Sequence, residues 1–308
     1  MPRNPIPITI LGGYLGAGKT TLLNHILRAT DRRLAIIVND FGSINIDADL
    51  IENQEGDTIN LANGCICCTL GEGFAAALIT ASNLQPPPDH ILVEASGVAD
   101  PYNLAQQVSM PGFQLDGVIV LADAERIRQQ ARDRYVGQTV LHQLRGADVI
   151  VLNKIDLVDD GTRKQLHAWL RELTGHVPII EAINGNAPLP LLFGHVSEPG
   201  RFMLEPVHEH RHHHSDDYET WSFSSSRPLA GDLFRALAAS LPQGIIRAKG
   251  ILYLQEDPER RHIFQLVGRR WRIEPGDAWG DQQPETKLVL IGLPGSIDEG
   301  ALQAKLVQ

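Results

Sequence analysis

The chain of 308 residues has little cysteine: it has three, all within four positions. A disulfide framework needs cysteines spread along the chain, so this distribution excludes one and favours a reducing compartment, the cytoplasm. No uninterrupted apolar run reaches the roughly 20 residues that span a bilayer, and the N-terminal residues do not have the pattern of a signal peptide. We therefore expect a cytoplasmic protein with no membrane partner.

Basic residues are also scarce: 27 lysines and arginines stand against 37 aspartates and glutamates, giving a formal net charge of −10. A general nucleic-acid binder needs a basic surface to neutralise phosphates, so we expect no nucleic-acid partner. The deficit does not exclude a single nucleotide held by backbone amides. Hydrophobic residues make up 43% of the chain, which at this length allows a large core and two domains.

Short apolar runs alternate with helical patterns up to about residue 195. The expected strands are Ile6–Leu11, Leu34–Val38, Ile91–Val93, Val118–Ala122 and Val149–Leu152. The expected helices are Thr20–Leu27, Gly73–Thr80, Ala124–Arg132, Val140–Leu144 and Arg163–Leu173. This alternation predicts an α/β domain over 1–203, with a mostly parallel sheet covered by helices on both faces.

The pattern changes after residue 203. Residues 204–217 are polar and aperiodic and contain five of the twelve histidines, which is typical of an exposed linker. Mostly strands follow, so we expect a small α+β domain over 218–308. Its elements are expected at Thr220–Phe223, Leu233–Ser240, Arg247–Leu254, His262–Val267, Arg270–Ile273 and Lys287–Ile291.

A glycine-rich loop between the first strand and the first helix matches the phosphate-loop pattern G-x4-G-K-[ST]. Its glycines let several backbone N–H groups point at one phosphate, and the helix N-terminus adds a favourable dipole. We expect Lys19 to reach the β- and γ-phosphates and Thr20 to bind Mg²⁺. The expected nucleotide contacts in this loop are Gly13, Gly16, Ala17, Gly18, Lys19, Thr20 and Thr21.

An acid, Glu94, ends the Ile91 strand, and Gly97 follows three residues later. In P-loop proteins an acid at this place holds Mg²⁺ or its water, and the glycine senses the γ-phosphate. Because the acid is glutamate rather than the commoner aspartate, we expect it to act through water or on the attacking water. Lys19, Glu94 and Gly97 are the predicted catalytic residues. Asp123, at the end of the next strand, is a weaker candidate.

The sequence N-K-x-D occupies 153–156, directly after a hydrophobic strand. Asp156 is predicted to accept hydrogen bonds from N1–H and the exocyclic amine of guanine, a donor pair that adenine lacks. Lys154 is expected to lie over the base, and Asn153 to brace neighbouring loops. In frame after the phosphate loop, the motif favours GTP over ATP. The segment Glu181–Asn184 is a candidate for the rest of the base pocket.

The loop Asn39–Asp47 follows the second strand, where P-loop GTPases carry a segment ordered by the γ-phosphate and Mg²⁺. Asp47 is the candidate in this loop for the magnesium shell. A solvated acidic loop is the alternative interpretation of these residues.

The cysteines Cys65, Cys67 and Cys68 lie in sequence between these two switch segments. Residues two apart in an extended stretch point the same way, so Cys65 and Cys67 could hold one ion, with Cys68 reachable if the chain turns. Thiolates favour Zn²⁺, Cu⁺ and other soft or borderline ions, while cobalt, nickel and iron stay open. Buried structural cysteines and a redox pair are the alternatives. The linker histidines could hold metal only loosely, or form a polar tether.

Taken together, the motifs resemble the CobW-like GTPases, a family of metallochaperones related to the nickel-insertion accessory GTPases. One departure lies in the loop after the second strand, where the family usually has Asn-Glu-Phe-Gly-Glu and this chain has Asp40 and Ser43 in place of the two acids. The resemblance covers nearly the whole chain and rests on Gly13–Thr21, Asn39–Asp47, Gly64–Cys68, Glu94–Gly97 with Asp100-Pro101, Asn153–Asp156, Arg247–Gly250 and Leu290–Gly292.

The resemblance implies a P-loop GTPase domain followed by a CobW-type C-terminal domain. It implies GTP and magnesium as cofactors and a transition metal, zinc or cobalt, bound by the three cysteines and delivered to a client metalloprotein or cofactor-synthesis enzyme. No arginine finger is identifiable, so we expect slow basal turnover, raised by a partner or by a nucleotide- or metal-dependent homodimer. A GTP-dependent regulatory switch with structural cysteines, a small-molecule kinase and a passive metal store are the alternatives.

Overall fold

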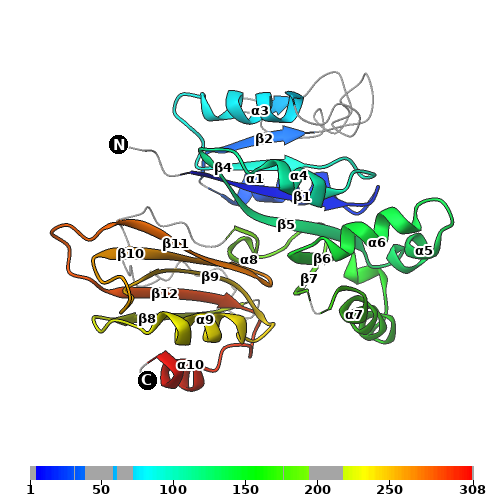
Figure 1. Ribbon diagram of the computed structural model, residues 1–308. Helices are drawn as coiled ribbons and strands as arrows, with labels where there is room; N and C mark the ends of the chain where they lie inside the picture. The colour runs from blue at the N-terminus through cyan, green and yellow to red at the C-terminus, as the bar shows by residue number, and fades with distance from the viewer. Residues whose placement is uncertain are drawn as a thin grey trace. The chain divides into compact units, whose positions relative to one another are not determined.

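The computed structural model describes residues 5–30, 32–38, 58–60, 72–175, 177–193 and 218–306. The chain divides into two compact units, Met1–Ala187 and Pro188–Gln308, and Figure 1 labels most of their elements. None of the helices in these described ranges combines the length and the hydropathy needed to cross a membrane.

A parallel sheet forms the centre of the first unit. Its seven strands lie in the order β3-β2-β4-β1-β5-β6-β7, and every neighbouring pair is parallel. The central strands are buried on both faces, which is why they appear in the sequence as continuous apolar runs. The strands are β1 (Ile6–Gly13), β2 (Leu34–Val38), β3 (Thr58–Asn60), β4 (His90–Glu94), β5 (Phe113–Asp123), β6 (Val149–Asn153) and β7 (Ile179–Ala182).

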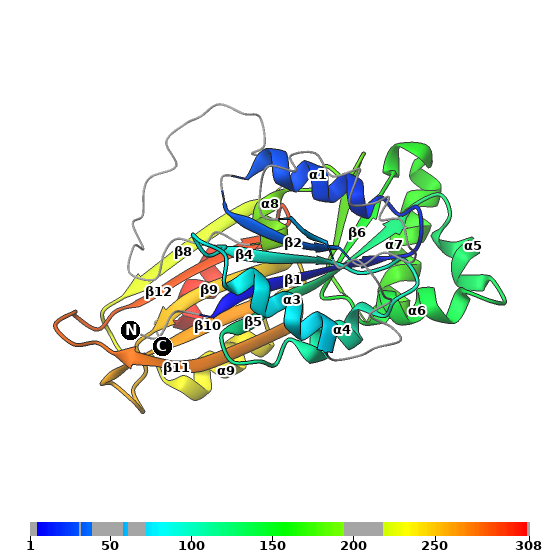
Figure 2. The same ribbon diagram turned by 90° about the horizontal axis from the view of Figure 1, so that it is seen from above.

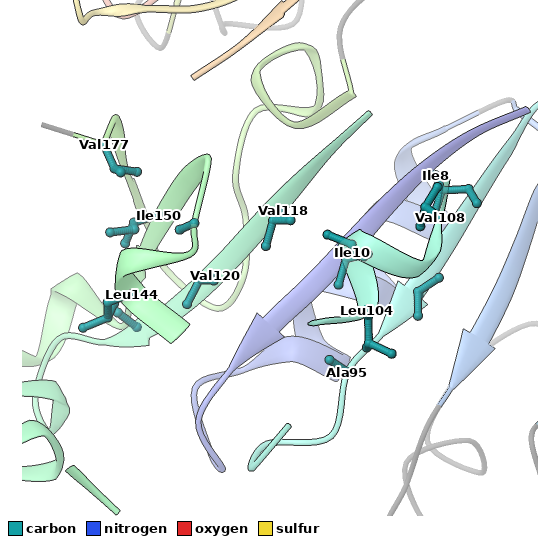
Figure 3. Packing of buried hydrophobic residues seen from close by; sticks show 14 of the residues in the cluster. Ile8, Ile10, Ala95, Leu104, Val108, Val118, Val120, Leu144, Ile150 and Val177 are labelled. Atoms are coloured by element: carbon teal, nitrogen blue, oxygen red, sulfur yellow. The ribbon is translucent and has the colours of Figure 1, made fainter. Parts of the chain in front are cut away.

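Helices cover both faces of this sheet. Figure 2 shows α1 (Lys19–Ala29) on one side and α3 (Glu72–Ser82), α4 (Pro101–Gln107) and α6 (Gly137–Arg145) on the other. On the latter side, side chains of α4 and α6 pack over β1, β5 and β6 in one continuous core (Figure 3). The remaining elements of this unit are α5 (Ile127–Arg132), the 3₁₀ turn η1 (Ile155–Leu157) and α7 (Asp160–Thr174). The predicted α/β architecture is confirmed.

Some local predictions were wrong at element ends. The helix expected from Ala124 begins only at Ile127, because the Asp123 carboxylate accepts the backbone N–H of Glu125 at 2.9 Å and holds a turn there. The sequence also missed α4, a helix of seven residues. Asp100 caps it by accepting the N–H of Tyr102 at 2.9 Å, and a proline fills its first position.

The second unit contains an antiparallel sheet in the order β11-β10-β9-β12-β8. Its core includes Phe234 from α9, which meets Phe264 from β10 edge-on with ring centroids 4.9 Å apart. This is the small α+β architecture that the sequence predicts. The elements are α8 (Leu189–Phe193), β8 (Glu219–Ser225), α9 (Gly231–Ala239), β9 (Ile245–Leu252), β10 (Arg260–Val267), β11 (Arg270–Ala278), β12 (Thr286–Gly292) and α10 (Glu299–Leu306).

The short helix α8 belongs to the second unit by its contacts, although the sequence alone places it in the first domain. Arg247, a β9 residue that is 2% exposed, donates from Nε to the carbonyl of Leu191 at 2.9 Å and from its terminal nitrogen to the carbonyl of Leu192. These carbonyls lie at the end of α8, where helical partners run out, so a buried cation satisfies them. The linker 204–217 lies outside the described residues.

Glu219, the first residue of β8, holds the loop at 295–297. Its carboxylate accepts the N–H of Gly295 at 3.1 Å, the hydroxyl of Ser296 at 3.2 Å and the N–H of Ile297. Burial favours the neutral acid and would raise the pKa of Glu219. The hydrogen bonds, led by that from Ile297, outweigh burial and hold this pKa below its ordinary value.

We expect Glu219 to contribute stability that is lost in acid. A carboxyl with a lowered folded-state pKa stabilises the fold above its unfolded pKa of about 4.3, and that stability disappears as the pH falls through the folded value. Glu219→Gln should lower the free energy of unfolding near neutral pH and make it less pH-dependent below about pH 4. Denaturant titrations across this range, with the exposed Glu299→Gln as control, check this. An acid dependence as steep as that of the wild type would contradict it.

Candidate nucleotide-binding site

The carboxyl edge of the parallel sheet brings the predicted nucleotide motifs together. The strands β4, β1, β5 and β6 are consecutive in the sheet, so the segments that follow them share one edge. In the register, Leu11 of β1 pairs with Glu94, and Asp123 pairs with Asn153. Open parallel sheets bind their ligands at this edge, where the strand order reverses.

The phosphate loop joins β1 to α1, and its Gly13, Gly16 and Gly18 all have positive φ. Gly18 has φ 101° and packs so closely on the Asn153 side-chain nitrogen that a Cβ would overlap it. Only glycine fits such a position without strain. Of the other predicted contacts, Ala17 is buried and Thr21 is exposed.

Lys19 begins α1 and is 8% exposed. Its Nζ donates to the carbonyl oxygen of Gly13 at 3.0 Å, so the charged group lies back over the phosphate loop. The first turn of α1 has no acidic residue to neutralise the positive end of the helix dipole. A lysine ammonium beside the N-terminus of a helix, whose first N–H groups have no partner within the helix itself, is the chemistry that holds a phosphate.

Thr20 and Glu94 come together beside this loop. The Thr20 hydroxyl donates to Oε1 of Glu94 at 3.3 Å, and Glu94 is 2% exposed at the end of β4. A hydroxyl and a buried carboxylate at this separation are oxygen ligands of the kind that Mg²⁺ takes, so these two residues fit a magnesium ion. Asp47, the other predicted magnesium ligand, lies outside the described residues.

Gly97 lies directly against the phosphate loop. A Cβ at this position would be 2.9 Å from the backbone nitrogen of Leu15 and 2.5 Å from its side chain. No real Cβ atom approaches backbone so closely, so the loop after β4 reaches the phosphate loop only because residue 97 is glycine. The predicted catalytic residues Lys19, Glu94 and Gly97 thus all border the phosphate loop.

Asn153 connects three segments of the site. Its Nδ2 donates to the carbonyl of Ala17 at 3.0 Å, its Oδ1 accepts the N–H of Gly185 at 2.9 Å, and its carbonyl accepts the N–H of Ala124 at 2.9 Å. The side chain is buried. Both ends of its amide therefore bind protein, and Asn153 braces the phosphate loop against the turn after β7.

Lys154 forms an ion pair with Asp123, with Nζ 2.7 Å from Oδ2. Asp123 is 2% exposed, and its Oδ1 accepts the N–H of Glu125. The sequence suggested Asp123 as a weak magnesium candidate, but in the structure its carboxylate holds Lys154 in place. The register hints at this pair, because Asp123 is aligned with Asn153, the residue before Lys154.

Asp156, the predicted guanine reader, lies exposed on η1. Glu181, the first residue of the suggested base-pocket segment, binds Arg163 and His167 of α7, each with a nitrogen 2.6 Å from Oε1. The residue that reaches the site is Gly185, directly after the suggested segment, whose N–H donates to Asn153. Sequence reasoning missed Gly185, although an Asn-Gly dipeptide marks a turn.

Comparison with known families agrees with this arrangement. The family model "CobW/HypB/UreG, nucleotide-binding domain" matches residues 7–181, and "Cobalamin synthesis protein cobW C-terminal domain" matches residues 218–308. The chain belongs to the CobW/HypB/UreG family. The resemblance inferred from the motifs is thereby confirmed.

Similar members of this family cover almost the whole chain. "Zinc chaperone YjiA" of Escherichia coli is 31% identical over 94% of this chain and 95% of its own length. "Zinc chaperone CobW" of a Sinorhizobium species is 30% identical over 99% of this chain and 97% of its own. A solved structure, "Crystal structure of Zn(II)-bound YjiA GTPase from E. coli", has a TM-score of 0.48 and 25% identity, covering 99% of both chains.

The cysteines Cys65, Cys67 and Cys68, the loop Asn39–Asp47 and the linker histidines lie outside the described residues. The ends of the strands that precede the loop and the cysteines, β2 and β3, are described. Val38 ends β2 and pairs with Glu94 on one side and Asn60, the end of β3, on the other. The chain therefore leaves both strands at the edge that carries Glu94. Within the described ranges, no group of three or more His, Cys, Asp or Glu could hold a metal.

Proposed function

We propose that this chain is a GTP-hydrolysing metallochaperone of the cytoplasm, which carries a transition metal on its cysteines and delivers it to a client metalloprotein or cofactor-synthesis enzyme. The observation that carries the proposal is the convergence, at one sheet edge, of the phosphate loop, the Thr20–Glu94 pair and the braced N-K-x-D motif. This is the set of groups that binding and hydrolysis of GTP require.

Each group has a distinct part in the nucleotide chemistry. Lys19 and the N-terminus of α1 hold the β- and γ-phosphates, and Asp156 reads the guanine edge. Magnesium, which Thr20 and Glu94 would hold, supplies positive charge to the phosphate oxygens. Glu94 also orients water at the γ-phosphate, and the Gly97 N–H senses whether that phosphate is present. Turnover is slow until a partner or a second copy adds charge to the site.

The metal is the cargo, and we propose zinc, because the two relatives described above are both named zinc chaperones. Cobalt is the alternative. Cys65, Cys67 and Cys68 would hold the ion as thiolates, the form that zinc prefers. The route to coupling is the shared sheet edge: Asn60, five residues before Cys65, is two strands from Glu94. Closure of the loops around GTP tightens the metal site, and hydrolysis loosens it.

Reciprocal binding tests this proposal. If GTP strengthens zinc binding, zinc must strengthen GTP binding by the same factor, typically about 5- to 150-fold. We expect this coupling in the wild type and its loss in Cys65→Ser/Cys67→Ser, with GDP affinity changed little by zinc in either. Calorimetric titrations of GTP and of GDP, with and without zinc, measure it.

Equal GTP affinities with and without zinc in both proteins would overturn the coupling. Full GTPase activity without zinc binding would instead favour a GTP-dependent regulatory switch whose cysteines are structural.

A further inference from the structure

We propose that Gln143 is a positioning residue, which sets how the loop after β4 presents Gly97 to the terminal phosphate of the nucleotide. The inference rests on the proposed function, because it assigns a new residue to the same site. None of the sequence motifs includes Gln143, which lies on α6.

Gln143 is 1% exposed and donates two hydrogen bonds from Nε2, one to the carbonyl of Gly97 at 3.1 Å and one to the carbonyl of Ala99 at 2.7 Å. A primary amide nitrogen has two hydrogens, so both bonds form at the same time. Its neighbours on the buried side of α6, Val140 and Leu144, are apolar. A glutamine among them would be unfavourable unless its polar atoms were satisfied, and the loop carbonyls satisfy its amide nitrogen.

The two bonded carbonyls enclose a tight turn. The N–H of Ala99 donates to the carbonyl of Ser96 at 2.9 Å, so Gly97 and Val98 are the central residues of the turn. Gln143 fixes the peptide group that follows Gly97 and the one that follows Ala99. Gly97 also packs against Leu15 of the phosphate loop. The turn is thus held between α6 and the phosphate loop.

This arrangement has a consequence for discrimination between nucleotides. GTP differs from GDP only by the γ-phosphate, and in the proposed function the Gly97 N–H senses that phosphate. The Gly97 N–H belongs to the Ser96–Gly97 peptide group, whose carbonyl accepts the Ala99 N–H, and Gln143 holds the turn in which this bond forms. An N–H in a turn that is already fixed binds without further ordering, whereas a loose turn must first be ordered. Gln143 therefore acts through Gly97, without touching the nucleotide. It should strengthen the binding of GTP but not that of GDP.

The test is Gln143→Met, which removes both donors while keeping the length and approximate volume of the side chain. Gln138→Met, an exposed glutamine on the same helix, is the matched control. With Mg²⁺ present, we expect Gln143→Met to lower GTP affinity and kcat by about tenfold and to change GDP affinity by less than about twofold. Amide hydrogen exchange at 95–100 should be faster than in the wild type. Gln138→Met should change none of these.

Two outcomes distinguish a failure of this inference from a failure of the proposed function. If the wild type binds GTP and Gln143→Met weakens GTP and GDP equally, or changes only the melting temperature, the inference is overturned and the proposed function stands. If the wild type binds no GTP, the proposed function is overturned and the inference with it. Should Gln143→Met fail to fold, Gln143→Asn is measured in the same way, since its amide is one methylene too short to reach both carbonyls.

Discussion

Lys19→Ala should reduce GTP hydrolysis by at least about a hundredfold. It removes the ammonium group that lies over the phosphate loop, where Nζ donates to the carbonyl of Gly13. The ammonium neutralises charge that grows on the phosphate oxygens in the transition state. Lys19 is only 8% exposed, so water screens its charge little. Removal of the hydrogen bond to Gly13 also leaves the loop less firmly held.

Steady-state GTP hydrolysis measures this effect, and a thermal melt shows that the variant is folded. Lys164→Ala is the matched control, because Lys164 is an exposed lysine on α7 outside the site. A Lys19→Ala protein that hydrolyses GTP within a few-fold of the wild type would exclude the phosphate loop as the catalytic centre. Zinc binding without nucleotide should be unchanged in both variants.

Asp156→Asn should change the base specificity of the site from guanine to xanthine. Xanthine has a carbonyl where guanine has its exocyclic amine, so an asparagine amide can accept from N1–H and donate to that carbonyl. The aspartate, which only accepts, pairs with guanine alone. We expect GTP affinity to fall by at least about a hundredfold, because the guanine amine would face a donor, and XTP to be bound in preference.

Competition binding with GTP, XTP and ATP, in wild type and variant, decides this. Asp160→Asn is the control, since Asp160 is an exposed aspartate of the neighbouring helix. Asp156 is exposed and lies on a 3₁₀ turn, so the substitution should leave the fold intact. If Asp156→Asn kept its preference for GTP over XTP, the N-K-x-D motif would not be the base reader.

The sequence was most reliable where burial dominates. The strand β2 has the predicted bounds, Leu34–Val38, because a strand buried on both faces needs an unbroken run of apolar β-formers. The short elements α4 and β7 were missed, because four to seven residues are too few for a periodic pattern. Similarly, the start of α5 depends on one turn made by the Asp123 side chain.

Within the site, motifs predicted which residues gather but not which pairs form. The phosphate loop, Glu94 and N-K-x-D were recognisable because their chemistry requires fixed spacing. The pairing of Asp123 with Lys154 and the two bonds of Gln143 join residues 31 to 46 positions apart, and no local pattern encodes them. The one sequence feature that pointed to the Gln143 bonds was a glutamine among the apolar residues of the buried side of α6.

The bracing by Asn153 has a kinetic consequence. Since its amide already binds the phosphate loop and the turn at Gly185, this half of the pocket has its shape before a ligand arrives. Little ordering of this half then remains when a nucleotide first binds, so GDP and GTP should associate at similar rates. The difference in their affinities should then come from their dissociation rates. The cell's ratio of the two nucleotides would then largely determine which one arrives first.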